Sequence, residues 1–300
     1  MTTADATLPR ERRGLVRGLA RFLHAHPRLQ LALLLGPPLG WLLVAYLGSL
    51  AVMLVSAFFR VDVFTFQVIP DVSLDNFRTL ASSEVYRTIT IRTLAVAAAV
   101  TLTDVLIAFP IAYYMARVAG SRARSLLVVA VLLPLWSSYL VKVYAWYLIL
   151  SESGPLNWLL GPLGLRGPGY GDVATWLVFS YLWLPYMILP IYAGLQRIPD
   201  SFLEASSDLG ARAGLTFRRI VLPLAFPAVV AGSIFTFSLT LGDYITPQIV
   251  SNTQFIGNVV YREVGVSGNL PFAAAFATIP IAIMLVYLIV ARRLGAFESL

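Results

Sequence analysis

Long apolar runs alternate with short polar segments along most of the chain. Six of these runs carry no charge or almost none. Each reaches the ~20 residues that a helix needs to cross ~30 Å of hydrocarbon at ~1.5 Å per residue. Membrane-spanning β-barrels show ~10-residue segments of alternating hydrophobicity, whereas these runs are continuous. The pattern predicts an all-α membrane protein in which one domain, 29–293, contains six transmembrane helices, at about 30–59, 93–116, 125–150, 173–195, 222–244 and 270–291.

Composition supports a membrane protein and narrows the chemistry. Hydrophobic residues make up 58% of the chain and charged residues only 12%, against ~25% charged in an average globular protein. There is no cysteine, which excludes disulfides, thiolate metal sites and a catalytic thiol. The net charge of +7 reports membrane topology in such a protein, and we expect no nucleic-acid partner.

The basic residues orient the spans. With the N-terminus in the cytoplasm, fifteen arginines lie inside and six outside, and this excess on the cytoplasmic side agrees with the positive-inside rule. The first arginines of the inside set lie in a basic N-terminal segment, 1–28. This orientation places both termini in the cytoplasm. The inside set is Arg10, Arg12, Arg13, Arg17, Arg21, Arg28, Arg117, Arg122, Arg124, Arg197, Arg212, Arg218, Arg219, Arg292 and Arg293; the outside set is Arg60, Arg78, Arg87, Arg92, Arg166 and Arg262.

The cytoplasmic loop 197–222 has a helical pattern of its own. Ser201 and Glu204 form a capping-box pattern at a helix start, and Gly210 marks a left-handed helix end. The helix between them has one small and apolar face, made of Phe202, Ala205, Ser206 and Leu209. An amphipathic helix resting on the membrane is one interpretation. The helix is short and acidic, however, where interfacial helices are usually basic, and this favours a groove on a partner protein.

The same loop carries a motif that resembles a known family. Glu204-Ala205-Ser206, three residues, Gly210, nine residues and then Ile220-Val221-Leu222-Pro223 is similar to the EAA motif of permease subunits in ABC-type importers. Ser206 stands where the family has a second alanine. The resemblance implies a type I, MetI-like permease fold in a bacterial inner membrane. It also implies a coupling helix, with contacts to the ATPase from Phe202, Glu204, Ala205, Ser206, Asp208, Leu209, Gly210, Ile220, Leu222 and Pro223.

No residue pattern in the chain predicts catalysis or a cofactor. A P-loop needs GxxxxGK[ST], and the single lysine, Lys142, lies inside an apolar run. ATP and Mg²⁺ therefore belong to a separate subunit, and neither HExxH nor GxSxG occurs. The resemblance implies a complex in the lipid membrane with two ATPase subunits, a second permease chain and a periplasmic or lipid-anchored solute-binding protein.

Further segments resemble the PotB/PotH-like branch of spermidine and putrescine permeases. They are 109–114 (FPIAYY), 134–138 (PLWSS), 154–157 (GPLN), 242–247 (GDYITP), 256–259 (IGNV) and 270–275 (LPFAAA). Lys142 and Leu270 depart from the usual arginine and tryptophan. The resemblance implies polyamine import. Ferric iron, thiamine or another small nutrient remain alternatives within the same role, and a secondary transporter is the alternative from another class.

Ionisable groups inside spans are costly and are functional candidates by default. Asp104 and Lys142 lie about 17 Å and about 14 Å from the outer ends of their spans at ~1.5 Å per residue, so they either form an internal ion pair or line the path of a cation. Asp243 lies near the outer mouth, either as a solvated helix-end residue or in a gate. The predicted substrate path is Asp104, Trp136, Tyr139, Lys142, Asp243 and Tyr244.

Overall fold

The computed structural model describes residues 24–62, 64–65 and 67–295, so most of the predicted basic segment, 1–23, lies outside the described residues. The chain divides at Ser56 into two compact units, where we had predicted one domain over 29–293. The described part of the first unit is a 30-residue helical run composed of α2 (Pro27–Trp41), the π-helix η2 (Leu42–Leu47) and α3 (Gly48–Ser56). Its length and apolar composition suit the first span.

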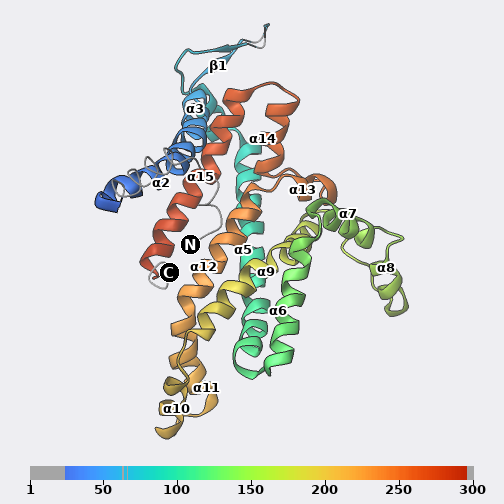
Figure 1. Cartoon of the computed structure of the whole chain (residues 1–300). Coiled ribbons are helices and arrows are strands. Elements are labelled where there is room, and N and C mark those ends of the chain that lie inside the picture. Colours follow the sequence, from blue (N-terminus) through green and yellow to red (C-terminus); the bar gives the residue numbers. More distant parts are fainter. Residues whose placement is uncertain (1–23, 63, 66, 296–300) are drawn as a thin grey trace, which may run out of the picture. The chain divides into compact units, whose positions relative to one another are not determined.

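The second unit is also helical, apart from a short antiparallel hairpin on the predicted outer side (Figure 1). Its elements are β1 (Arg60–Val61), β2 (Val68–Ile69), α4 (Asp75–Ser82), α5 (Glu84–Tyr113), η3 (Tyr114–Val118), α6 (Ser121–Trp136), α7 (Tyr139–Leu150), α8 (Pro155–Leu160), η4 (Gly161–Leu163), α9 (Asp172–Gln196), α10 (Asp200–Asp208), α11 (Ala213–Thr216), η5 (Phe217–Val221), α12 (Leu222–Gly242), α13 (Ile245–Val250), α14 (Ile256–Gly265) and α15 (Leu270–Arg293). Among the described residues, five helical runs are long and apolar enough to cross a membrane, and a bent pair makes a sixth. The predicted all-α class is confirmed.

Helix α5 begins well before the predicted start of the second span at 93. It starts at Glu84 and takes in Arg92, which we had placed in an outer polar segment. Arg92 Nε lies 3.4 Å from Asp172 Oδ2 at the start of α9, and its guanidinium donates to Gln254 O at 3.3 Å. Arg92 therefore ties the outer part of α5 to the start of α9 and to Gln254.

The predicted third span, 125–150, is broken instead of continuous. α6 and the helical run Tyr139–Leu163, which begins with α7, meet at an angle of 93°. The two residues between them, Ser137 and Ser138, have extended ψ values. The break leaves the Pro134 carbonyl without an intrahelical partner. Ser137 Oγ donates to it at 2.8 Å and Lys142 Nζ at 3.0 Å. A cation at a helix C-terminus is also favourable to the helix dipole.

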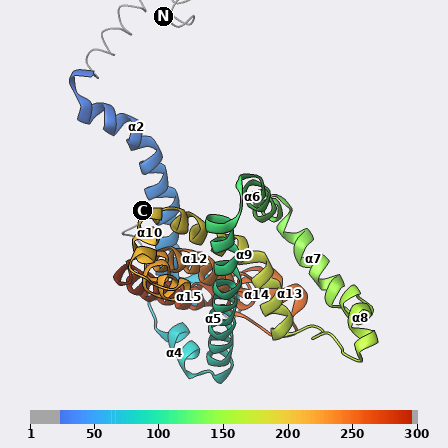
Figure 2. The same cartoon turned by 90° about the horizontal axis from the view of Figure 1, so that it is seen from below.

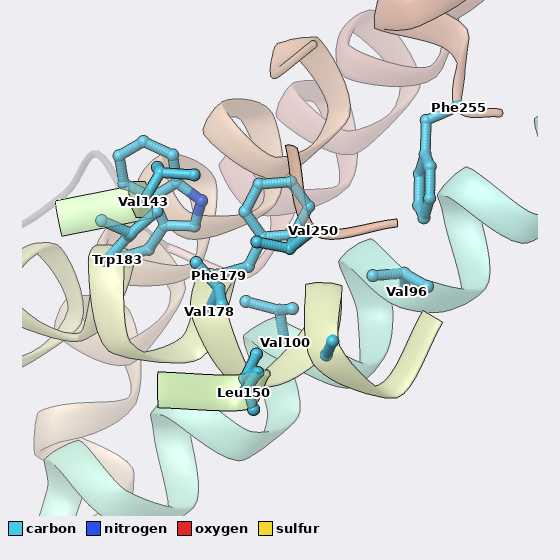
Figure 3. Close-up of a cluster of buried hydrophobic side chains, with 11 residues drawn as sticks. Val96, Val100, Val143, Leu150, Val178, Phe179, Trp183, Val250 and Phe255 are labelled. Atoms are coloured by element: carbon cyan, nitrogen blue, oxygen red, sulfur yellow. The ribbon is translucent and has the colours of Figure 1, made fainter. Parts of the chain in front are cut away.

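A bundle of α5, α9 and α12 forms the centre of the second unit (Figure 1). One buried cluster packs Val96 and Val100 of α5 against Phe179 and Trp183 of α9 (Figure 3). A second cluster lies toward the cytoplasmic loop 197–222 and includes Met115 and Ile191. Figure 2 shows α6, α7 and α8 running away from this bundle on one side.

Helices α9 and α12 approach each other closely at two glycines. A Cβ added to Gly194 of α9 would lie 2.3 Å from the Cβ of Ala228, and one added to Gly232 of α12 would lie 2.8 Å from Met187 Sδ. Small residues allow helix backbones to pack at short distance in membranes, where dispersion contacts replace the hydrophobic effect.

We predict that Gly194→Ala destabilises this bundle, because the new methyl group has no space against Ala228. Overpacking of this kind costs about 1–3 kcal/mol, and thermal unfolding in detergent should show a lower midpoint. Gly265→Ala at the end of α14 is the control, since nothing lies within 4 Å of its added Cβ. Equal melting temperatures for the two variants would contradict the close α9–α12 contact.

Candidate functional site

The loop helix α10 spans Asp200–Asp208 and begins one residue earlier than predicted. Its N-cap is Pro199, and no side chain caps it, so the predicted capping box of Ser201 and Glu204 is wrong. The earlier start puts Ser201 inside the first turn, where it can no longer serve as N-cap. Asp200 in that turn is favourable to the positive end of the helix dipole.

The end of α10 follows the sequence prediction. Gly210 has a φ of 73°, the left-handed conformation that glycine adopts without steric cost. Its N–H donates to Ser207 O at 2.8 Å, and the Ala211 N–H donates to Ser206 O at 3.0 Å. This pair of bonds is the Schellman motif that closes a helix at glycine.

The predicted small and apolar face of α10 is only partly exposed. Ala205 is exposed and Leu209 is 88% exposed, but Ser206 is buried. Its Oγ lies 2.8 Å from Thr216 Oγ1 of α11. The serine that departs from the family's alanine therefore joins the two short helices of the loop, and it is not on the outer surface. Phe202 lies at the edge of a mainly apolar cavity of about 370 Å³.

The other motif residues lie on α10 or in the helices that follow it. Glu204 and Asp208 are exposed on α10. Ile220 belongs to η5, while Leu222 and Pro223 open α12. α11, η5 and α12 form one helical run from Ala213 to Gly242, so the last part of the loop continues into a span without a break in the helix.

A second candidate site lies at the other end of α12, where Asp243 holds three elements together. Asp243 Oδ1 accepts the backbone N–H groups of Ile245 at 2.7 Å and Thr246 at 3.1 Å. Asp243 Oδ2 accepts the hydroxyls of Tyr139 and Thr246. These four donors fill the acceptor sites of the carboxylate, so Asp243 fixes the start of α13 and ties it to α7.

Tyr139, Asp243 and Tyr244 also line a cavity of about 360 Å³, together with Trp183 and Ser238. The Tyr139 ring stacks on Trp183 with centroids 6.0 Å apart. The faces of aromatic rings beside an acidic group attract organic cations. Neither Trp183 nor Thr246 was among our sequence candidates. Trp183 lies in a uniformly apolar run, and nothing in its local pattern marks it.

Trp136 is separated from this cavity. It is the last residue of α6, before the bend, and is 87% exposed. The sequence placed it with Tyr139 on one continuous helix, and the bend puts the two residues on different arms. It does not line the cavity that Tyr139 lines.

Asp104 and Lys142 do not form the ion pair that was one of our two interpretations. Lys142 donates to Pro134 O. Asp104 is fully buried in α5, and neither of its oxygens has a hydrogen-bond partner among the described residues. Ser180 Oγ and Trp183 Nε1 of α9 are likewise buried without a partner there. Asp104 is therefore a buried carboxyl group that no protein contact of the described chain explains.

Comparison with known proteins decides the family. The family described as "Binding-protein-dependent transport system inner membrane component" matches residues 108–297, more than half of the chain. The protein belongs to this family. It is an inner-membrane, multi-pass permease subunit of an ABC importer, and this subunit is not an enzyme. The predicted family and location are confirmed, and the alternative of a secondary transporter is set aside.

Two relatives cover most of the permease. It is 47% identical over 295 residues to the inner membrane ABC transporter permease protein YdcU of Escherichia coli K12, covering 93% of this chain and 94% of the relative. It is 28% identical over 241 residues to the spermidine/putrescine transport system permease protein PotB of Haemophilus influenzae, covering 78% and 83%.

Solved structures show the same fold. A bacterial alginate ABC transporter in complex with an alginate-bound periplasmic protein aligns with a TM-score of 0.69 at 20% identity, covering 92% of this chain and 97% of that one. The methionine transporter MetNI, in an inward-facing conformation, aligns with a TM-score of 0.53 at 16% identity, covering 67% and 90%. The MetI-like fold predicted from the sequence is confirmed.

We predict that Tyr139→Phe loosens the start of α13 in this permease, because Asp243 loses one donor. Hydrogen bonds to a charged or buried group are worth about 1–3 kcal/mol. Hydrogen exchange of residues 243–250, measured by mass spectrometry, should become faster. The control is Tyr144→Phe, which removes a hydroxyl from an exposed tyrosine of the same helix. Unchanged exchange in Tyr139→Phe would show that Asp243 does not depend on this contact.

Proposed function

We propose that this permease imports a polyamine such as spermidine or putrescine, and that α10 is the helix that docks on its ATPase partners. The single observation that carries the solute proposal is Asp104, a fully buried carboxyl group in a membrane helix without a protein partner in the described chain. Resemblance to the PotB relatives, which covers 78–85% of this chain, supports the same solute class.

The chemistry of Asp104 favours a cationic solute. A carboxylate at membrane depth is costly and persists where it meets a cation, a proton or water in a path. Lys142, which the sequence places at a similar depth in the membrane, does not pair with Asp104 and donates to Pro134 O instead. Asp104 is fully buried in this conformation. A polyamine carries protonated amines, so a transport conformation that opens Asp104 to the path would bring it the missing counter-charge. The aromatic cavity around Tyr139 and Trp183 suits the same cations.

Reconstitution tests the solute directly. The permease, its ATPase, a second permease chain and the solute-binding protein are placed in proteoliposomes, and uptake of labelled spermidine and putrescine is measured with and without ATP. We expect saturable, ATP-dependent polyamine uptake. Uptake of ferric iron or thiamine in place of polyamine would contradict the solute, and uptake that persists without ATP would contradict the ABC mechanism.

We predict that Asp104→Asn lowers polyamine uptake by roughly tenfold, equal to ~1.4 kcal/mol, while the variant folds at least as well as the native chain. The amide keeps the shape of the side chain and removes a buried charge that has no partner. The double variant Asp104→Asn/Lys142→Met should not recover uptake, because the two side chains are not paired.

Asp62→Asn is the matched control. Asp62 accepts backbone N–H groups of the outer hairpin, a role that asparagine also fills.

Recovered uptake in the Asp104→Asn/Lys142→Met double variant would contradict the proposed role and would mean that Asp104 serves only helix packing.

The surface of α10 supports the coupling proposal. A short helix with exposed Ala205 and an 88% exposed Leu209 at its end, closed by a glycine motif, fits a groove on a partner protein. A short turn joins it to the helical run Ala213–Gly242, which contains a span. We propose two ATPase subunits per complex, each docking on the α10 of one permease chain. ATP-driven closure of the ATPase pair would then move α10 and the helices attached to it.

We predict a graded response at Gly210. Gly210→Asn should retain most coupling, because asparagine tolerates the left-handed conformation. Gly210→Pro should lose it, because proline cannot adopt a φ of 73° and lacks the N–H that bonds Ser207 O. Co-purification of the ATPase and ATP-driven uptake are measured for both variants. Full activity in Gly210→Pro, with the protein correctly inserted, would refute the assignment of α10.

A further inference from the structure

One arginine outside the EAA motif joins the coupling loop to a different part of the bundle. Arg117 lies in η3, the π-helical end of α5, and its side chain is only 12% exposed. Its guanidinium donates to Leu195 O at 2.5 Å, to Ile198 O at 2.6 Å and to Asp200 Oδ1 at 2.6 Å. These acceptors lie at the end of α9, in the connection that follows, and at the first residue of α10.

A second arginine secures the element from which Arg117 projects. Arg124 of α6 donates to Met115 O at 3.1 Å and to Ala116 O and Ala119 O at 3.4 Å each. These carbonyls belong to η3 and the residue that follows it. Two guanidinium groups therefore connect α6 to η3 and η3 to the corner between α9 and α10. Figure 2 shows α6 beside α5 at this end of the bundle.

The contacts of Arg117 have two separable parts. Carbonyls at a helix C-terminus lack intrahelical donors, and a guanidinium satisfies several of them in a fixed planar geometry. This part stabilises the end of α9. The ion pair with Asp200 is different, since Asp200 is 81% exposed and exposed pairs contribute little to stability. Its effect is geometric, because it ties the start of α10 to α5, a helix that is not adjacent to it in the chain.

We propose that Arg117 is a positioning residue that transmits displacement of α10 to α5 and α6 during transport. This inference rests on the proposed docking of α10 on the ATPase. α5 already packs along α9 and α12, and Arg117 bonds two carbonyls at the end of α9. The contact with Asp200 adds a direct link between the first residue of α10 and α5, the helix that carries Asp104 thirteen residues, or about 20 Å, away.

The test uses the complete transporter in proteoliposomes and measures the ATP hydrolysed for each solute molecule imported. Asp200→Asn removes the charge of the exposed partner and leaves both carbonyl contacts of Arg117. We expect this variant to import several-fold less solute per ATP hydrolysed, and ATPase co-purification is measured beside it. Arg117→Lys, whose ammonium cannot span all three acceptors, should behave similarly. Arg122→Gln is the control, since Arg122 is an exposed residue of the same region.

A second readout follows the transmission itself. Hydrogen exchange of residues 113–119 is compared before and after addition of ATPase and ATP. The native permease should show a change there, and Asp200→Asn should not. A native-like ATP-to-solute ratio in Asp200→Asn overturns the proposal, and so does loss of ATPase binding, which would make Asp200 a docking residue. If the native transporter shows no ATP-driven uptake, the coupling function proposed for α10 fails instead.

Discussion

Hydrocarbon offers no hydrogen-bond partner to a peptide group, so each break or end of a helix near the membrane needs a side chain to satisfy it. The polar residues of this permease follow that constraint. Ser137 and Lys142 satisfy the Pro134 carbonyl where the third span bends, and Arg117 satisfies the carbonyls that end α9. Asp243 satisfies the first N–H groups of α13.

Hydrogen-bond partners distinguish the charged residues that stabilise the fold from those that are candidates for function. Lys142 and Asp243 were both candidates for the substrate path, yet each stabilises nearby backbone. Lys142 donates to the Pro134 carbonyl, and Asp243 accepts four donors at the start of α13 and from Tyr139. Asp104 has none in the described chain. An ionisable side chain that costs free energy and stabilises no backbone group is retained for another reason. Asp104 is therefore a stronger functional candidate than either of the others.

The sequence predicted the all-α class and the permease family, because these depend on long apolar runs and on one motif with fixed spacing. It missed the bend at Ser137–Ser138, since hydropathy is the same on both sides of it. It placed the start of α5 too late, because Arg92 appeared to end the span until its partner Asp172 was visible. The roles of Arg117 and Trp183 could not be predicted, since both depend on contacts between residues distant in the chain.

The close contacts of Gly194 with Ala228 and of Gly232 with Met187 also restrict how the bundle can move. Close packing at two levels opposes sliding of α9 along α12. We therefore expect the hairpin that they form, with α10 and α11 at its tip, to move as one body. Conformational change in this half of the permease is then of the hinge type. A small rotation at the tip becomes a larger displacement at the far ends of both helices.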